Sequence, residues 1–196
     1  MKSIEGLIKF HDFLHEFQRI ERVVDVPGRA APENDVEHSF HLAMAAWYLA
    51  DEFPELDRDK LIRYALIHDI VEVHAGDTFF AGSEEEQSTK AEREHAALDK
   101  ITAEWVEFPE MAASIRDYEA RKDDEAQFVY ALDKIMPIIV IMQANGKTWQ
   151  DHSISYKKLL DAKYDKVASS KYILPYFQQV MKILQNKPEL FAPEDI

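Results

Sequence analysis

The chain has 196 residues, of which 46% are hydrophobic and 31% charged, so it is long enough to bury a core and too polar for a membrane protein. With 23 basic against 37 acidic residues, its net charge of −14 disfavours nucleic acid and anionic membrane surfaces as partners, because like charges repel. The absence of cysteine excludes disulfides, thiol nucleophiles and thiolate metal sites, so a metal would have to be held by histidine and carboxylate.

Several features predict a soluble, cytoplasmic and mostly helical protein. The chain contains 5 glycines, too few for a fold that depends on many tight hairpin turns. Charged residues occur throughout segment 1–17, unlike the apolar core of a secretory signal. No apolar run approaches the ~20 residues that span a bilayer, so no membrane partner is expected.

The first part of the chain is predicted to form three helices. Apolar residues at helical spacing across 7–20 indicate the first, which we expect to end near Arg22. Segment 25–35 contains two prolines, a glycine and a polar cluster, which are typical of a loop that ends in a helix N-cap. The other two helices are expected at 36–53 and, after an N-cap at Asp57, through 61–73.

Helical periodicity continues through the rest of the chain. The helix that follows Ser83 has an acidic first turn and a narrow apolar stripe, as a surface helix should. Pro137 is expected to kink or break the helix that contains it. The predicted helices are 83–105, 109–122, 123–146, 154–168 and 172–186. No repeat or long linker divides the chain, so the sequence predicts one all-α domain, 1–196, a bundle of roughly seven or eight helices.

Polar groups inside apolar helices are the main candidates for a functional site. His68 and Asp69 interrupt one apolar helix, and Asp133 interrupts another. A buried, unpaired carboxylate is so unfavourable that we expect a bound cation to compensate these charges. His38 lies one turn before the apolar stripe of its own helix and is expected to face the same interior. These two histidines and two aspartates supply nitrogen and oxygen ligands for a divalent metal.

Each of these residues alone has an ordinary explanation. A single histidine on a helix face is more often a partly buried, hydrogen-bonded residue than a metal ligand, and an aspartate in an apolar helix can be ion-paired or cap a turn. The His-Asp dipeptide is itself weakly specific, since it also occurs at His11 and Asp12. The order of all four residues along the chain is the more specific signal.

That order, a histidine, a His-Asp pair and a late aspartate on a helical bundle, resembles the signature of the HD-domain metal-dependent phosphohydrolase superfamily. The blocks PENDVEHS (32–39), HDIVEVHAGD (68–77) and ALDKI (131–135) occur in family order and look like the branch that contains the bacterial 5′-deoxynucleotidases. The resemblance covers roughly residues 5–145 and implies a helical bundle of the HD-domain type, with C-terminal helices at 150–186.

The resemblance also implies how the metal and the catalytic groups are distributed. His38, His68, Asp69 and Asp133 would coordinate one divalent cation, for which Mn, Co, Mg, Fe, Ni and Zn are all compatible. Glu72 would be the catalytic acid that protonates the leaving oxygen, while Asp69 would also orient the attacking water.

Two substrate-binding residues follow from the same resemblance. Arg22 matches the phosphate-binding arginine of this branch if one residue is inserted in the following loop, with Arg19 and Arg29 as alternatives. Asp77 would bond the sugar of the substrate. Val23 stands where those deoxynucleotidases carry a tryptophan, so a preference for deoxyribonucleotides is left open.

Other interpretations of the polar residues compete with these roles. Glu72 is alternatively a solvated carboxylate beyond a helix end, and Asp77 a turn residue. His41 is expected either to pack or to contact the groups that surround the metal ligands, whereas His74 and His95 are expected to face solvent. We therefore expect one metal ion, because no further histidine is predicted to join the site.

The predicted function is metal-dependent release of phosphate from nucleoside 5′-monophosphates, including deoxyribonucleotides. The substrate would be a small phosphate ester rather than a nucleic acid polymer. The alternatives are a pyrophosphohydrolase or phosphodiesterase acting on a signalling nucleotide or nucleoside triphosphate, and a non-catalytic helical protein with a metal. Relatives of this kind are commonly dimeric, so a homodimer is expected.

Overall fold

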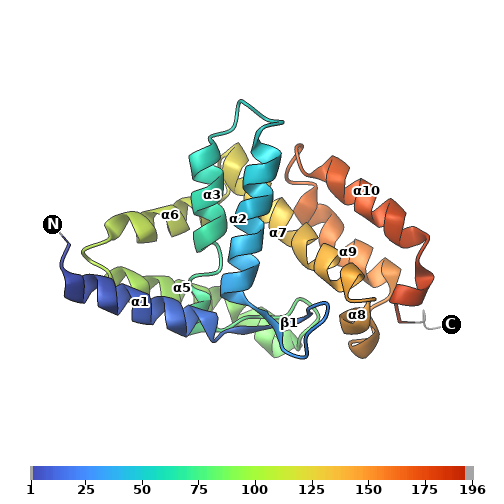
Figure 1. Ribbon diagram of the computed structural model, residues 1–196, viewed down its shortest axis with the longest axis horizontal. Helices are drawn as coiled ribbons and strands as arrows, with labels where there is room; N and C mark the ends of the chain where they lie inside the picture. Colours follow the sequence, from blue (N-terminus) through green and yellow to red (C-terminus); the bar gives the residue numbers. More distant parts are fainter. Residues whose placement is uncertain (1, 193–196) are drawn as a thin grey trace.

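Amphipathic segments of the sequence form most of the helices in the computed structural model, which describes residues 2–192 (Figure 1). The predicted all-α bundle is confirmed, with short extra helices that raise the number to ten α-helices within the described range. In chain order the elements are α1 (Ile4–Gln18), β1 (Glu21–Asp25), β2 (Pro32–Asn34), α2 (Asp35–Ala50), α3 (Arg58–Ile67), α4 (Glu72–Ala75), α5 (Glu84–Glu104), α6 (Pro109–Ala120), α7 (Asp124–Gln143), α8 (Lys147–Asp151), α9 (Tyr156–Val167), α10 (Leu174–Gln185) and a 3-10 helix, η1 (Pro188–Leu190).

Side-chain caps set the starts of several helices. Asp57 accepts from the backbone N–H of Lys60 at the start of α3, as predicted, and Ser83 caps α5. Asn34 accepts from the backbone N–H of Glu37, whose side chain returns a bond to the Asn34 backbone. This reciprocal capping box explains why α2 begins directly after the polar cluster of the preceding segment.

The segment between the first two helices differs from the prediction. α1 ends at Gln18 rather than near Arg22, and the expected loop contains a small antiparallel pair, β1 with β2, in which Glu21 lies opposite Asn34. Val24 of β1 is buried in the main core. The backbone of this segment therefore pairs across the hairpin instead of extending the helix, and it holds Arg22 on a strand.

The predicted third helix is also shorter than expected. α3 ends at Ile67, a tight turn follows, and the chain resumes as the four-residue α4. Within the turn the Glu72 N–H donates to the Asp69 carbonyl, while the Ala65 carbonyl accepts from the His68 ring. This side-chain bond occupies a carbonyl that a continuing helix would use, which fits the end of α3 at this point.

Pro137 does not break α7, which is continuous from Asp124 to Gln143. Of the two predicted effects, the break is therefore wrong, whereas a kink within the continuous helix stays a prediction. Ile135, Ile138 and Ile141 of this helix are buried, and their packing accounts for a helix that persists past a residue without a backbone N–H.

α7 lies at the centre of the main core. It packs against α2, α3, α6, α9, α10 and β1. A second buried cluster joins α1 to the turn before α4 and to α5 and α6, on the side of the α2–α3 pair opposite α9 and α10 (Figure 1). The turn that carries the His-Asp pair therefore lies where the two clusters meet. No helix within residues 2–192 is both long and apolar enough to cross a bilayer.

Candidate metal centre

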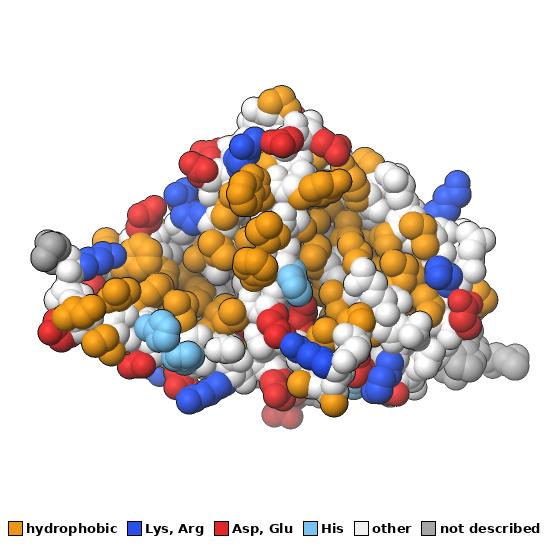
Figure 2. Space-filling model, in the orientation of Figure 1, with side chains coloured by type: hydrophobic (Ala, Val, Ile, Leu, Met, Phe, Trp, Pro, Cys, Tyr) orange, Lys and Arg blue, Asp and Glu red, His pale blue; other side chains and the backbone are white. Residues whose placement is uncertain are grey.

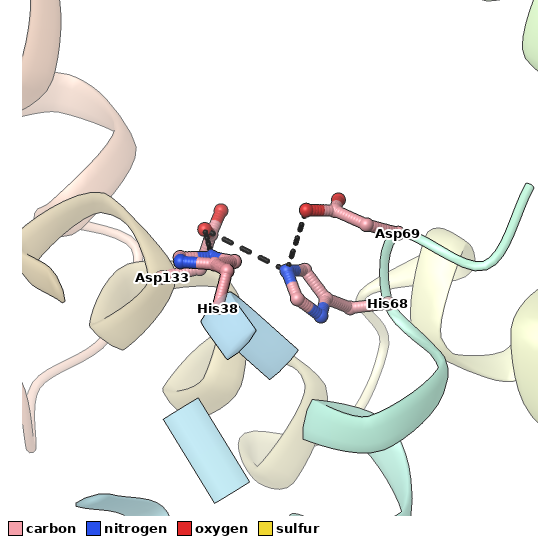
Figure 3. Close-up of side chains that lie close together, drawn as sticks. All are labelled: His38, His68, Asp69 and Asp133. Carbon is pink, nitrogen blue, oxygen red and sulfur yellow. Dashed lines mark hydrogen bonds and ion pairs between the residues drawn. The ribbon is translucent and has the colours of Figure 1, made fainter. Parts of the chain in front are cut away.

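Four side chains from three parts of the fold converge on one point. His38 comes from α2, His68 and Asp69 from the turn after α3, and Asp133 from α7 (Figure 3). Each offers one ligand atom, and these atoms all lie within 4.8 Å of one another. His38 Nε2 is 2.9 Å from Asp133 Oδ1, and His68 Nε2 is 2.9 Å from Asp69 Oδ2. The structure thus brings together the four residues predicted as metal ligands.

The two histidine rings are oriented as metal-binding imidazoles are. His68 Nδ1 donates to the Ala65 carbonyl over 2.9 Å, which leaves Nε2 available for either a proton or a metal ion. That Nε2 is buried and has no hydrogen-bond partner among residues 2–192, although Asp69 is close. His38 Nδ1 lies 3.4 Å from Glu33 Oε2, so its Nε2 also faces the carboxylates. The donor set and the orphaned nitrogen fit a divalent cation.

The charges around His68 favour a positive centre at this point. Burial lowers the pKa of His68, but attraction by Asp69 and Asp133 outweighs it and raises the pKa to about 10. Burial raises the pKa of Asp133, yet the nearby Lys134 ammonium and the two histidines hold that pKa well below its usual range. Because the site stabilises positive charge so strongly, a divalent cation would compete effectively with the proton.

A second acidic cluster adjoins the first and shares Asp69 with it. Ligand atoms of Asp35, Asp69 and Glu72 lie within 4.8 Å of one another. Arg22 stands between two of these carboxylates, with Nη1 3.1 Å from Asp35 Oδ1 and 2.7 Å from Asp69 Oδ2. Its Nε also lies 3.5 Å from Glu33 Oε2. β1 therefore delivers to the acidic site the arginine that the sequence predicted for phosphate.

Glu72 is buried at the first position of α4, and its Oε2 has no hydrogen-bond partner among residues 2–192. This position contradicts the alternative of a solvated carboxylate. Burial, followed by repulsion from Asp69 and Asp35, raises the pKa of Glu72 well above its usual value. The same pattern of burial and repulsion by Asp69, partly offset by Arg22, raises the pKa of Asp35 to about 6. Burial and the neighbouring carboxylates therefore favour the protonated form of Glu72.

Asp77 reaches the same pocket from the loop after α4. Gly76 ends α4 with φ of 74°, a left-handed conformation that a side chain would strain. The chain turns there and directs Asp77 back to the pocket, where burial raises the pKa of its carboxyl. Asp77 can therefore be both a residue of this turn and a residue that binds the substrate.

A cavity of about 300 Å³ opens beside the ligand cluster. Its polar lining includes Arg22, His68, Asp69, Glu72, Asp77 and Asp133, and its apolar lining includes Val23, Phe79, Phe80, Ile138, Trp149 and Leu159. A small ligand with a charged end and an organic body matches this division.

Sequence reasoning missed three residues of this site. Glu33 and Asp35 are 1% and 0% exposed. Both contact Arg22, and Glu33 also contacts the ligand His38. Asp35 lies three residues before His38, so helical spacing was the available signal. Lys134 donates to Asp133 Oδ2. No signal in the sequence predicted this contact, because adjacent residues of a helix point in different directions.

The exposure of the other histidines agrees with the prediction only in part. His95 is exposed, as expected. His74 is not: its side chain is 17% exposed and its Nε2 lies 3.1 Å from Glu104 Oε2, because α4 packs against α5. His41 is 54% exposed, so it does not pack, but its Nδ1 lies 3.7 Å from Glu33 Oε1. Because Glu33 in turn lies 3.4 Å from His38, this contact agrees with the other predicted arrangement, a position just outside the ligands.

The alternative arginines do not reach the site. Arg19, the residue that follows α1, pairs with the exposed Glu16, and Arg29 pairs with Glu37. Arg22 is the arginine among these three that lines the pocket.

Comparison with known proteins identifies the family. A family model described as HD domain matches residues 14–173. The chain belongs to the HD-domain family. This confirms the resemblance predicted from the sequence blocks, and with it a metal-dependent hydrolase.

Relatives of this HD-domain chain cover almost its full length. A mouse protein named 5′-deoxynucleotidase HDDC2 is 29% identical over 185 residues, which are 93% of this chain and 88% of that protein. The crystal structure of a predicted metal-dependent phosphohydrolase from Magnetospirillum magnetotacticum is 28% identical, with a TM-score of 0.81 over 97% of this chain and 98% of that one. A conserved hypothetical protein from Pyrococcus furiosus shares the fold, with a TM-score of 0.62 at 20% identity over 91% of this chain and 99% of that one.

Proposed function

We propose that this HD-domain chain is a phosphomonoesterase that releases phosphate from nucleoside 5′-monophosphates. The observation that carries the proposal is the buried Glu72 carboxyl, whose raised pKa makes it a proton donor beside Asp69 and Arg22. The mouse relative named 5′-deoxynucleotidase supports the same substrate class.

The metal proposed for this enzyme is one divalent cation held by His38, His68, Asp69 and Asp133. When bound, such a cation polarises a phosphoryl oxygen and lowers the pKa of a water molecule. Mixed nitrogen and oxygen donors accept Mn, Fe, Co, Ni or Zn, and Mg where carboxylates and water dominate.

The protein groups around that position have distinct proposed roles. The Arg22 guanidinium holds two phosphate oxygens, since its planar fork matches them. Asp69 accepts a hydrogen bond from the attacking water and orients it toward phosphorus. As the bond from phosphorus to the 5′-oxygen breaks, Glu72 donates its proton to that oxygen. Asp77 accepts a hydrogen bond from a sugar hydroxyl.

The sugar preference depends on the pocket wall next to Arg22. Val23 lines this wall with a short apolar side chain, which offers no aromatic ring to the sugar. We therefore propose that ribonucleotides and deoxyribonucleotides are both substrates.

The proposal is tested by phosphate release from a panel of ribonucleoside and deoxyribonucleoside 5′-monophosphates. The protein is stripped of metal and reloaded with Mn, Co or Mg. Glu72→Gln should retain the metal and lose about 10²-fold or more in kcat, because proton donation by a positioned side chain is worth this much. Glu92→Gln, an exposed change on α5, is the control. A folded protein that releases no phosphate from any ester with any metal would refute the proposal.

A pyrophosphohydrolase is the second candidate, because lysine side chains also line the pocket. Product analysis separates the two functions. Inorganic phosphate and a nucleoside as the products of a nucleoside monophosphate support the monoesterase, whereas pyrophosphate released from a nucleoside triphosphate supports the alternative. The buried position of Glu72 argues against a purely structural metal site.

A homodimer and a cytoplasmic location remain predictions from sequence and resemblance. Exposed apolar side chains on α2 are consistent with a second copy packing there, and Figure 2 shows apolar atoms gathered over this helix. They are Phe40, Met44, Trp47 and Tyr48. Light scattering of the protein and of Trp47→Lys tests the homodimer: a monomeric wild type would refute it.

A further inference from the structure

The pocket contains a buried positive charge that the proposed reaction does not use. Lys163 of α9 lines the cavity and is 7% exposed. Its Nζ lies 4.4 Å from the centroid of the Phe80 ring, and it makes no hydrogen bond or ion pair within residues 2–192. Burial of an ammonium group without an anionic partner is unfavourable, so this position requires an explanation.

Two other cationic side chains of the pocket are already neutralised. Arg22 contacts Asp69 and Asp35, and Lys134 donates to Asp133. Their charges are offset by carboxylates of the two acidic clusters. Lys163 therefore differs from them in having no carboxylate at ion-pair distance in the described part of the chain.

Further basic groups lie around Lys163. Lys166 follows it by one helical turn and also lines the cavity, as do Lys90 of α5 and Arg121 after α6. Burial, followed by repulsion from Lys134, lowers the pKa of Lys163 to about 7, and the same causes lower the pKa of Lys166. The like charges are thus close enough to repel one another, in a chain whose net charge is −14.

The position of Lys163 within the pocket suggests which part of a ligand it meets. Phe80 lies beside its ammonium group, and Leu159, one turn earlier on the same face of α9, also lines the cavity. These apolar side chains suit the organic body of a nucleotide, whereas Arg22 and the metal ligands suit the phosphate that is hydrolysed. An anion at Lys163 would then be a different group of the same substrate.

We infer that Lys163 and Lys166 form a second anion subsite, which binds a phosphoryl group on the sugar of the substrate. The inference rests on the proposed function and names its substrate class as nucleoside 3′,5′-bisphosphates. Water adds to the 5′-phosphorus, the bond to the 5′-oxygen breaks, and that oxygen takes the proton. The products are inorganic phosphate and a nucleoside 3′-phosphate.

The test compares adenosine 5′-monophosphate with adenosine 3′,5′-bisphosphate as substrates of the metal-loaded enzyme. We expect kcat/KM to be about tenfold higher or more for the bisphosphate, the usual effect of one charge-assisted hydrogen bond. Lys163→Gln and Lys166→Gln should each reduce this ratio toward one. The exposed Lys158→Gln on the same helix should leave the ratio unchanged. Because Lys163→Gln removes a buried charge, its thermal melt should show a folded protein with a Tm no lower than that of the wild type.

A wild-type ratio near one, or a ratio that Lys163→Gln leaves unchanged in a folded and active enzyme, overturns the subsite. If neither nucleotide is hydrolysed, the proposed function fails instead, and calorimetric binding of the two nucleotides to the metal-loaded protein decides the subsite. Tighter binding of the bisphosphate that is lost in Lys163→Gln supports it, whereas equal binding of the two nucleotides overturns it.

Discussion

Arg22 Nη1 donates to Asp69 Oδ2 over 2.7 Å, although 47 positions separate the two residues in the chain. Asp69 Oδ2 also lies 2.9 Å from His68 Nε2. One carboxylate oxygen thus connects the proposed phosphate-binding arginine to the proposed metal ligands. A change at Asp69 would therefore disturb both groups, whereas a change at Arg22 tests substrate binding with all four proposed ligands in place.

Replacing Arg22 with lysine should weaken substrate use without removing the metal. A lysine keeps one positive charge but cannot present two parallel N–H groups to a phosphate. We expect kcat/KM for nucleoside monophosphates to fall roughly tenfold to a hundredfold, as for loss of a charge-assisted hydrogen bond. Steady-state kinetics and elemental analysis measure the two effects. Arg29→Lys, whose parent residue pairs with Glu37, is the control, and an equal loss in both variants would contradict this role.

Replacing Asp133 with asparagine should reduce metal content. The amide keeps the shape of the side chain but loses the negative charge next to His38 and His68. We expect bound metal after dialysis to fall by at least about tenfold, in line with the loss of a charged ligand. Elemental analysis per chain measures this, with the exposed Asp161→Asn as the control. Full metal occupancy in a folded Asp133→Asn protein would exclude Asp133 as a ligand.

Glu33 should act on the metal through His38. Its carboxylate lies 3.4 Å from His38 Nδ1 and 3.5 Å from Arg22 Nε, so it can orient both groups. Glu33→Gln should weaken metal affinity by about 10- to 100-fold, as loss of such supporting carboxylates does. Competition with a metal indicator measures the affinity. Glu37→Gln is a matched control, because glutamine can still complete the capping box of α2.

Replacing Lys163 with methionine should stabilise the fold at neutral and acidic pH. The folded state lowers the pKa of Lys163 from 10.5 to about 7, because burial disfavours its charged form. The unfolded chain therefore binds more protons between these two values, and the stability of the wild type rises as pH rises through this window. Below pH 7 the buried ammonium lowers the free energy of unfolding by its full amount, on the order of 5 kcal/mol.

Urea unfolding at pH 6 and pH 10 measures this difference. Lys163→Met should exceed the wild type in free energy of unfolding at pH 6, and the gap should narrow at pH 10. The exposed Lys158→Met should change neither value appreciably. A gap that stays constant from pH 6 to pH 10 would show that the buried ammonium is not its cause.

Local features of the sequence predicted the main helices because their causes are local. Apolar spacing marks the stripe that each helix buries, and a polar side chain at Asp57 or Ser83 satisfies backbone N–H groups only a few residues away. The order of the His-Asp blocks predicted the family for a related reason, since the metal requires these residue types on helices that pack together. The all-α fold and the HD-domain family were therefore accessible from the chain alone.

The sequence by itself determined the helical fold and the residue types of the site, whereas the tertiary structure decided which side chains meet. The hairpin that positions Arg22, the burial of Glu33 and Lys163, and the packing that encloses His74 all depend on contacts between distant segments. Such contacts have no sequence period, because they arise only when several helices pack around α7. Helical spacing placed Glu72 near the His-Asp pair, but its burial among like charges, which raises its pKa, belongs to the folded state.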